Sequence, residues 1–167
     1  ERMKKRILSF FSIVALCVAM AGSVVSAKTT DSDLKCVDGS YLTTEDSSTG
    51  YSHPPMAKGE YLMTGVSTIS KAGLTRVYAY ASTTANQTVD YMATLVYVER
   101  YNEETDNWGF VYAWAEEAEN ADYMSTADSV KVDRGYYYRV RSQHIAGDYD
   151  DYPYDETASF TDGILLP

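Results

Sequence analysis

Apolar and polar residues alternate along much of the chain, with the period of two that is typical of β-strands. The longest such stretch is Thr88–Ala115, and we interpret it as two long strands joined by an acidic turn. Both faces of Thr88–Arg100 are largely apolar, so we expect this strand to be central in its sheet. The polar residues Asn102–Asn107 predict the turn, and the aromatic alternation of Trp108–Ala115 predicts the second strand.

Shorter alternating stretches flank this hairpin. Tyr61–Ile69 and Leu74–Ala81 predict two strands joined at Gly73. Thr83–Gln87 is polar and predicts a turn. The acidic segment Glu116–Asp128 predicts irregular structure, with a helix as the alternative for Ala113–Ala121 because alanine and glutamate are frequent there. Three more strands are predicted at Ser129–Val132, Tyr136–Ile145 and Ala158–Leu166.

About seven short strands without helical periodicity favour an antiparallel β-sandwich. One segment adds detail, because Asp133 and Gly135 form a turn that a tyrosine-rich strand follows. This order is typical of the tyrosine corner, in which Tyr137 or Tyr138 would bond back to the turn. We therefore predict an all-β fold, an immunoglobulin-like or fibronectin-like antiparallel sandwich.

The first residues predict export rather than structure. Lys4-Lys5-Arg6, the apolar run Ile7–Ala21 and the small residues Val25-Ser26-Ala27 together have the pattern of a secretory signal peptide. We expect a signal peptide at 1–27, an extended polar arm at 28–60 with one short strand near Ser40–Thr43, and a sandwich domain at 61–167. The protein is then secreted and extracellular, without a membrane anchor after cleavage.

Charge and cysteine content narrow the choice of partners. The predicted leader holds four of the 14 basic residues and one of the 24 acidic residues, so the remaining chain carries 10 bases, 23 acids and a net charge of −13. Such a charge disfavours nucleic acid, which binds clustered lysine and arginine. Cys36 is the one cysteine after the leader, so no intrachain disulfide forms. It is either a small buried apolar residue or a link between copies.

Four local patterns together resemble an uncharacterised family of small secreted proteins from gut Gram-positive bacteria. They are Gly65-Val66-Ser67-Thr68-Ile69, Val98-Glu99-Arg100-Tyr101 followed by Trp108, Tyr137-Tyr138-Arg139-Val140-Arg141, and Ser159-Phe160-Thr161-Asp162-Gly163-Ile164. The resemblance covers roughly Tyr41 to Ile164. It implies export and a β-rich fold, and it implies no known activity, cofactor or catalytic residue.

Signals for enzymatic chemistry are weak. The two histidines, His53 and His144, do not belong to any catalytic or zinc-binding motif, and no G-x-S-x-G occurs. We therefore predict a protein that is not an enzyme and needs no cofactor. A small exported hydrolase, with two carboxylates across a cleft, is the last-ranked alternative.

The densest acidic run predicts a calcium site as one interpretation. Calcium prefers several carboxylate and carbonyl oxygens, and the candidate ligands are Asp148, Asp150, Asp151 and Asp155. The alternative is a solvated acidic loop.

The most informative pattern is one face of the predicted sheet. If Thr88–Arg100 and Tyr136–Ile145 are neighbouring strands, alternation places one set of side chains outward, namely Tyr91, Leu95, Tyr97, Tyr137, Arg139 and Arg141. Tyrosine and arginine are enriched in interface hot spots, and an outward leucine among them favours a contact surface. We expect a binding module for an extracellular protein or glycan. The alternatives are that residues 28–60 cover this face, that the tyrosines and arginines only stabilise the sheet, or that the protein self-associates as a homo-oligomer through Cys36 and its edge strands.

Overall fold

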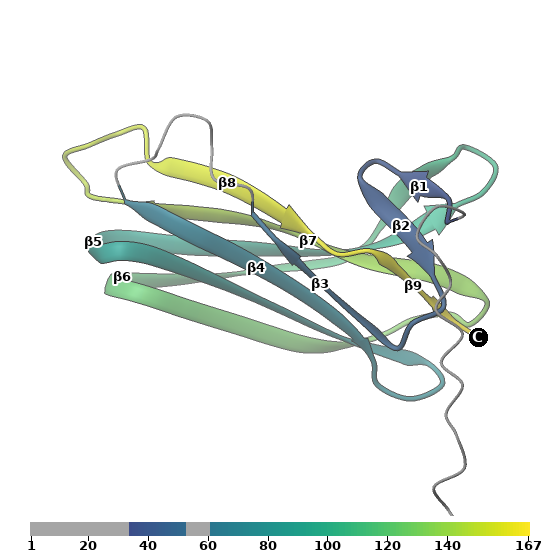
Figure 1. Ribbon diagram of the computed structural model, residues 1–167. Helices are drawn as coiled ribbons and strands as arrows, with labels where there is room; N and C mark the ends of the chain where they lie inside the picture. Colours follow the sequence, from purple (N-terminus) through teal and green to yellow (C-terminus); the bar gives the residue numbers. More distant parts are fainter. Residues whose placement is uncertain (1–33, 53–60) are drawn as a thin grey trace, which may run out of the picture. The chain divides into compact units, whose positions relative to one another are not determined.

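Nine strands make up the fold, in a computed structural model that describes residues 34–52 and 61–167 (Figure 1). The described residues contain no helix, which confirms the all-β prediction. The predicted leader lies outside them. The strands are β1 (Cys36–Val37), β2 (Ser40–Thr43), β3 (Ser47–Tyr51), β4 (Leu62–Lys71), β5 (Arg76–Asn102), β6 (Asn107–Lys131), β7 (Tyr136–Gly147), β8 (Asp155–Phe160) and β9 (Gly163–Leu166).

Strand β5 is the centre of the sheet, as its two apolar faces predict. Its first part pairs with β4 and β6, and its second part pairs with β6 and β7. The predicted turn at Thr83–Gln87 is wrong, because the strand continues through a register shift between Thr84 and Val89. Ala85 and Val89 are buried on either side of the polar residues. Burial of these two side chains therefore keeps the segment in the sheet.

Strand β6 corrects a second prediction. The segment Glu116–Asp128 is neither irregular nor helical, because β6 pairs with β5 from Asn107 to Lys131 apart from two register shifts. Its five acidic side chains are exposed, so they stay hydrated while the backbone pairs with β5. Backbone pairing with a central strand overrides the weak strand propensity of alanine and glutamate.

One mixed sheet, curled into a half-barrel, contains all nine strands (Figure 1). The strand order is β1-β2-β9-β7-β5-β4-β3, with β6 also on β5 and β8 also on β7. The predicted two-sheet sandwich is therefore not confirmed. The prediction of antiparallel pairing fails at one place, since β2 and β9 are parallel. This pair joins the start of the described chain to its last strand.

The curl brings β4 over β7, although these strands do not pair. The hydroxyl of Ser67 in β4 donates to the hydroxyl of Ser142 in β7 over 2.7 Å. Two apolar clusters fill the space between the layers. The larger includes Ile69, Val96 and Tyr138, and the smaller includes Tyr61 and Met92.

The tyrosine corner is present and its tyrosine is Tyr138. The buried Tyr138 donates its hydroxyl proton to the backbone carbonyl of Asp133 over 2.9 Å. This is the bond that the turn-and-tyrosine pattern predicts.

The N-terminal segment contributes more strands than predicted. The expected strand Ser40–Thr43 is confirmed as β2, and β1 and β3 also join the sheet. Strand β3 pairs with β4 through short polar residues such as Ser47 and Thr49. These residues carry no apolar pattern, so their pairing comes from the neighbouring strand rather than from their own side chains.

Candidate functional site

The predicted outward residues do lie on one side of the sheet. Strands β5 and β7 are antiparallel neighbours, with Leu95 opposite Gln143, Tyr97 opposite Arg141, and Glu99 opposite Arg139. Tyr137 lies beyond this paired region, opposite Leu165 of β9. Alternation along each strand therefore assembles most of the predicted set on one surface.

Arg139 lies on the same side of the sheet but is buried, with only 2% of its surface exposed. Its guanidinium bonds to Glu99 over 2.8 Å and to the Asp38 carboxylate over 3.0 Å, and it lies 4.6 Å from the centre of the Trp108 ring. Asp38 belongs to the turn between β1 and β2. The expectation that Arg139 is exposed is wrong, because this N-terminal hairpin and Trp108 cover it.

The opposite end of the surface is covered by the loop between β7 and β8. The Tyr91 ring packs against Tyr154, with ring centres 5.3 Å apart, and its hydroxyl donates to Glu117 over 2.8 Å. Burial and the Glu117 carboxylate together raise the pKa of Tyr91 to about 12. This tyrosine therefore serves mainly to hold the loop and β6 to the sheet.

Between the two covered ends, five side chains remain half-buried and form what we call the open face: Leu95, Tyr97, Arg141, Gln143 and Ile145. The guanidinium of Arg141 lies 4.2 Å from the centre of the Tyr97 ring. Its Nε donates to Glu99 over 3.0 Å. The Tyr97 ring and the Glu99 carboxylate thus hold the arginine in place through one face of its guanidinium and its Nε–H group.

The four candidate calcium ligands do not converge. Asp148 accepts the Asp90 N–H over 2.9 Å, Asp155 accepts the Tyr61 N–H over 2.6 Å, and Asp151 accepts the Tyr61 hydroxyl. Asp150 is exposed in the loop. No three histidine, cysteine or carboxylate side chains in the described ranges lie close enough to hold a metal ion. The carboxylates here tie loops to strands, and calcium binding stays a prediction.

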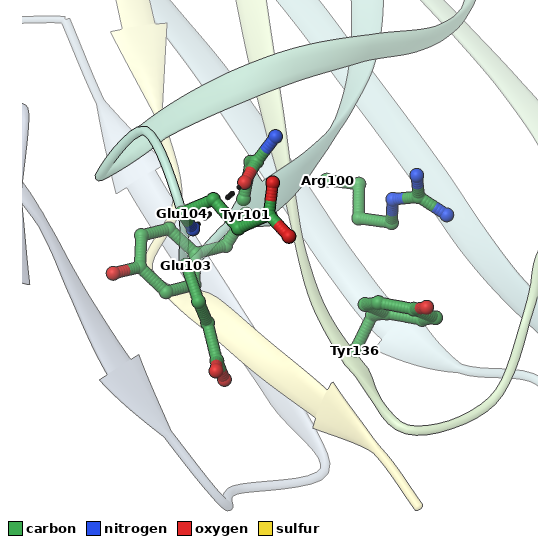
Figure 2. Close-up of a pocket in the computed structure, with 6 residues that line it drawn as sticks. Arg100, Tyr101, Glu103, Glu104 and Tyr136 are labelled. Atoms are coloured by element: carbon green, nitrogen blue, oxygen red, sulfur yellow. Dashed lines mark hydrogen bonds between the residues drawn. The ribbon is translucent and has the colours of Figure 1, made fainter.

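A pocket of about 350 Å³ lies where β5 turns into β6 (Figure 2). Arg100 and Tyr136 line one part of it, and Tyr101, Glu103 and Glu104 line another. Figure 2 shows the Arg100 guanidinium above the Tyr136 ring, 4.5 Å from the ring centre. Sequence reasoning missed this pocket, because the residues from Arg100 to Glu104 form no binding motif and Tyr136, which completes the lining, comes from β7.

A buried polar belt separates the two apolar clusters. Its members are Ser67, Thr83, Thr94, Ser142, His144 and Ser159. The ring of His144 bonds through Nε2 to the Ser159 hydroxyl and through Nδ1 to the Thr83 hydroxyl, each over 2.8 Å. Burial lowers the pKa of His144 to about 4, so the ring is neutral at pH 7. The serine–histidine contact has no access from solvent, since both side chains are at most 1% exposed.

Cys36 is exposed on β1 and free, so the interpretation of it as a buried apolar residue is wrong. Within the described ranges, no helix is long and apolar enough to cross a membrane.

Comparison with known proteins gives a family and no activity. The model of a family of unknown function (DUF6147) matches residues 21–159. No curated protein and no solved structure matches the chain. The family match agrees with the resemblance to an uncharacterised family, while a secreted, gut Gram-positive origin stays a prediction. Because the match spans well over half of the 167 residues, the chain belongs to this family of unknown function.

Proposed function

We propose that the protein is a secreted, non-enzymatic binding module that recognises an extracellular protein or glycan through its open face. The observation that carries the proposal is the pairing of Tyr97 with Arg141 on a half-exposed sheet surface. Aromatic rings with a fixed arginine are typical of binding hot spots. Leu95 adds apolar area beside them, and Gln143 adds an amide within 3.4 Å of the Tyr97 hydroxyl.

The burial of Arg139 reduces the set of residues that we propose to contact the partner. Arg139 and Tyr91 hold the covers at the two ends, so the contacts with a partner fall on Leu95, Tyr97 and Arg141. A sheet surface of this kind suits a protein surface or the face of a sugar ring better than a small molecule, which needs a concave pocket.

A screen of the purified protein on a glycan array and on bacterial and host cells tests the class of partner. The screen is run once with calcium and once with a chelator. We expect saturable binding to one class of surface. Calcium dependence would add the Asp148–Asp155 loop to the site, whereas the absence of binding in both conditions would contradict the proposal.

The second candidate function is self-association as a structural surface protein. The exposed, free Cys36 favours it, because an exposed thiol in an oxidising compartment can link two copies. Light scattering with and without reductant separates the two functions. A reductant-sensitive dimer supports self-association, and a monomer in both conditions rejects it.

A further inference from the structure

Strand β6 has a long edge that pairs with no other strand in the described part of the chain. Its one partner there is β5, and it is 25 residues long, whereas strands in globular proteins are usually five or six residues long. The unpaired N–H and C=O groups of such an edge are a template for another strand. Most natural edges are kept short or are protected by proline, by charged side chains (lysine above all) or by β-bulges. In β6 there is no proline, and the only lysine is Lys131 at its end.

The pairing pattern tells which backbone groups point away from β5. Val140 donates its N–H to the Thr161 side chain and accepts the Thr161 N–H, on the side away from β5. In an antiparallel pair both groups of one residue point the same way. Val98, opposite Val140, therefore directs its groups to Tyr112 of β6. Alternation then leaves four residues of β6 with N–H and C=O on the free side: Ala113, Ala115, Glu117 and Glu119.

The two halves of this edge differ. In the second half, Ser129 donates its N–H to the Asp128 carboxylate, and its C=O accepts from the Arg76 guanidinium. Side chains thus occupy both free-side groups of Ser129. In the first half, Tyr112–Glu119 keeps an unbroken register with β5 between two register shifts. This eight-residue segment is long enough for a whole added strand.

The charge of this segment selects its partner. Tyr112–Glu119 contains Glu116, Glu117 and Glu119 and no basic residue. All three glutamates are exposed, and the ion pairs of the described chain include none of them. A second copy of this edge would bring the same carboxylates against it, whereas lysine or arginine on a partner strand would face them favourably.

We propose that Tyr112–Glu119 is a docking edge for a basic, extended segment of a partner protein, which adds to the sheet as a further strand. This inference concerns the edge of β6 rather than the open face, so it stands independently of the proposed function. Strand addition of this kind takes affinity from backbone bonds and specificity from alternate side chains.

The test uses a short peptide of alternating valine and lysine. A peptide of alternating valine and glutamate, which carries the opposite charge, is the control. Binding is followed by fluorescence anisotropy and by residue-resolved amide exchange. We expect saturable, salt-sensitive binding of the basic peptide alone. Protection should rise at the four free-side amides of Ala113, Ala115, Glu117 and Glu119. Binding at the open face would leave these amides unprotected, so the two surfaces are distinguished.

Two proline variants provide the matched comparison. Ala115→Pro removes a free-side N–H without removing a bond to β5, and proline is tolerated at such edge positions. Ala127→Pro does the same in the second half, since alternation from Ser129 places its N–H on the free side. Ala115→Pro should weaken peptide binding about tenfold or more, which is about 1.4 kcal/mol, and Ala127→Pro should leave it unchanged.

In a third variant Glu116, Glu117 and Glu119 are all changed to glutamine. This variant keeps the backbone N–H groups and should also bind the basic peptide more weakly. It provides the test if Ala115→Pro does not fold. Equal binding by both proline variants and this triple variant would overturn the proposal. So would the absence of peptide binding, or a dimer of the protein that Ala115→Pro dissolves.

Discussion

At the scale of residues, Glu99 shows how the sheet holds the arm of the chain. Glu99 is 8% exposed and accepts one bond from Arg139 and one from Arg141. Arg139 also bonds to the Asp38 carboxylate and to the Ser40 hydroxyl. One buried guanidinium thus joins β5, β7 and the hairpin of β1 and β2. Its role is structural, while Arg141 is half-buried on the open face.

Arg139→Ala is predicted to destabilise the fold strongly. It leaves a nearly buried carboxylate with one partner fewer and releases the N-terminal hairpin, at a cost of about 3 kcal/mol. Arg141→Ala keeps the Glu99–Arg139 pair and removes a partly exposed contact, so it should cost less than about 1 kcal/mol. Denaturant unfolding measures both, and equal losses of stability would contradict this division of roles.

His144 gives the fold a dependence on pH. Its pKa is lowered by burial to about 4, compared with about 6.5 in an unfolded chain. Well above pH 6.5 the ring is neutral in both states, so it contributes no pH dependence there. As the pH falls from 6.5 towards 4, the unfolded chain binds a proton that the folded protein excludes. The free energy of unfolding should therefore fall, by about 3 kcal/mol at most.

Unfolding measured at several pH values in this window tests the role of the ring. His144→Gln keeps a polar side chain in the belt but has no proton to gain, so its stability should change much less between pH 6.5 and pH 4. A variant with the same slope as the wild-type protein would show that other groups cause the dependence.

At the scale of elements, the curl depends on close contact between β4 and β7. Gly65 of β4 lies on the His144 ring, and a Cβ at this position would come within 2.1 Å of the ring. Gly50 of β3 has a similar relation to the Phe160 backbone, at 1.8 Å. Glycine at these two positions therefore lets β3 and β4 approach the opposite layer. Neither glycine needs a positive φ, so the requirement is one of space.

Gly65→Ala is predicted to destabilise the fold by about 2 kcal/mol, because overpacking forces a shift of the ring or the strand. Gly109→Ala in β6 is the matched control, since its Cβ would lie 3.7 Å from the nearest atom, the Arg100 carbonyl oxygen. The control should be close to neutral in thermal unfolding. A Gly65→Ala protein as stable as the control would contradict the close approach of β4 and β7.

At the scale of the whole molecule, the alternation of apolar and polar residues predicted which segments form strands and which side chains share a face. It gave the all-β class, the central strand, and the shared face of Tyr97 and Arg141. The turn at Asp133 and Gly135 narrowed the corner residue to Tyr137 or Tyr138, and the structure shows that it is Tyr138. Alternation did not give the length of β6, because exposed acids can occupy a strand that a central neighbour holds by its backbone. It also did not give the burial of Arg139, because that depends on a hairpin distant in sequence. The pocket at Arg100 was missed as well, because its consecutive residues form no binding motif and Tyr136 joins them only in the fold.

The central proposal is that the open face binds the partner, and one pair of variants tests it directly. The Tyr97→Ala, Arg141→Ala double variant removes its ring and its cation. The control is Arg76→Ala with Tyr78→Ala, which removes an exposed arginine and tyrosine from the first part of β5. Titration of each labelled protein onto the surface that the wild-type protein binds is the measurement. We predict that the Tyr97→Ala, Arg141→Ala variant binds at least about tenfold more weakly than the wild-type protein, while the control binds as the wild-type protein does. Unchanged binding by the Tyr97→Ala, Arg141→Ala variant would contradict the account.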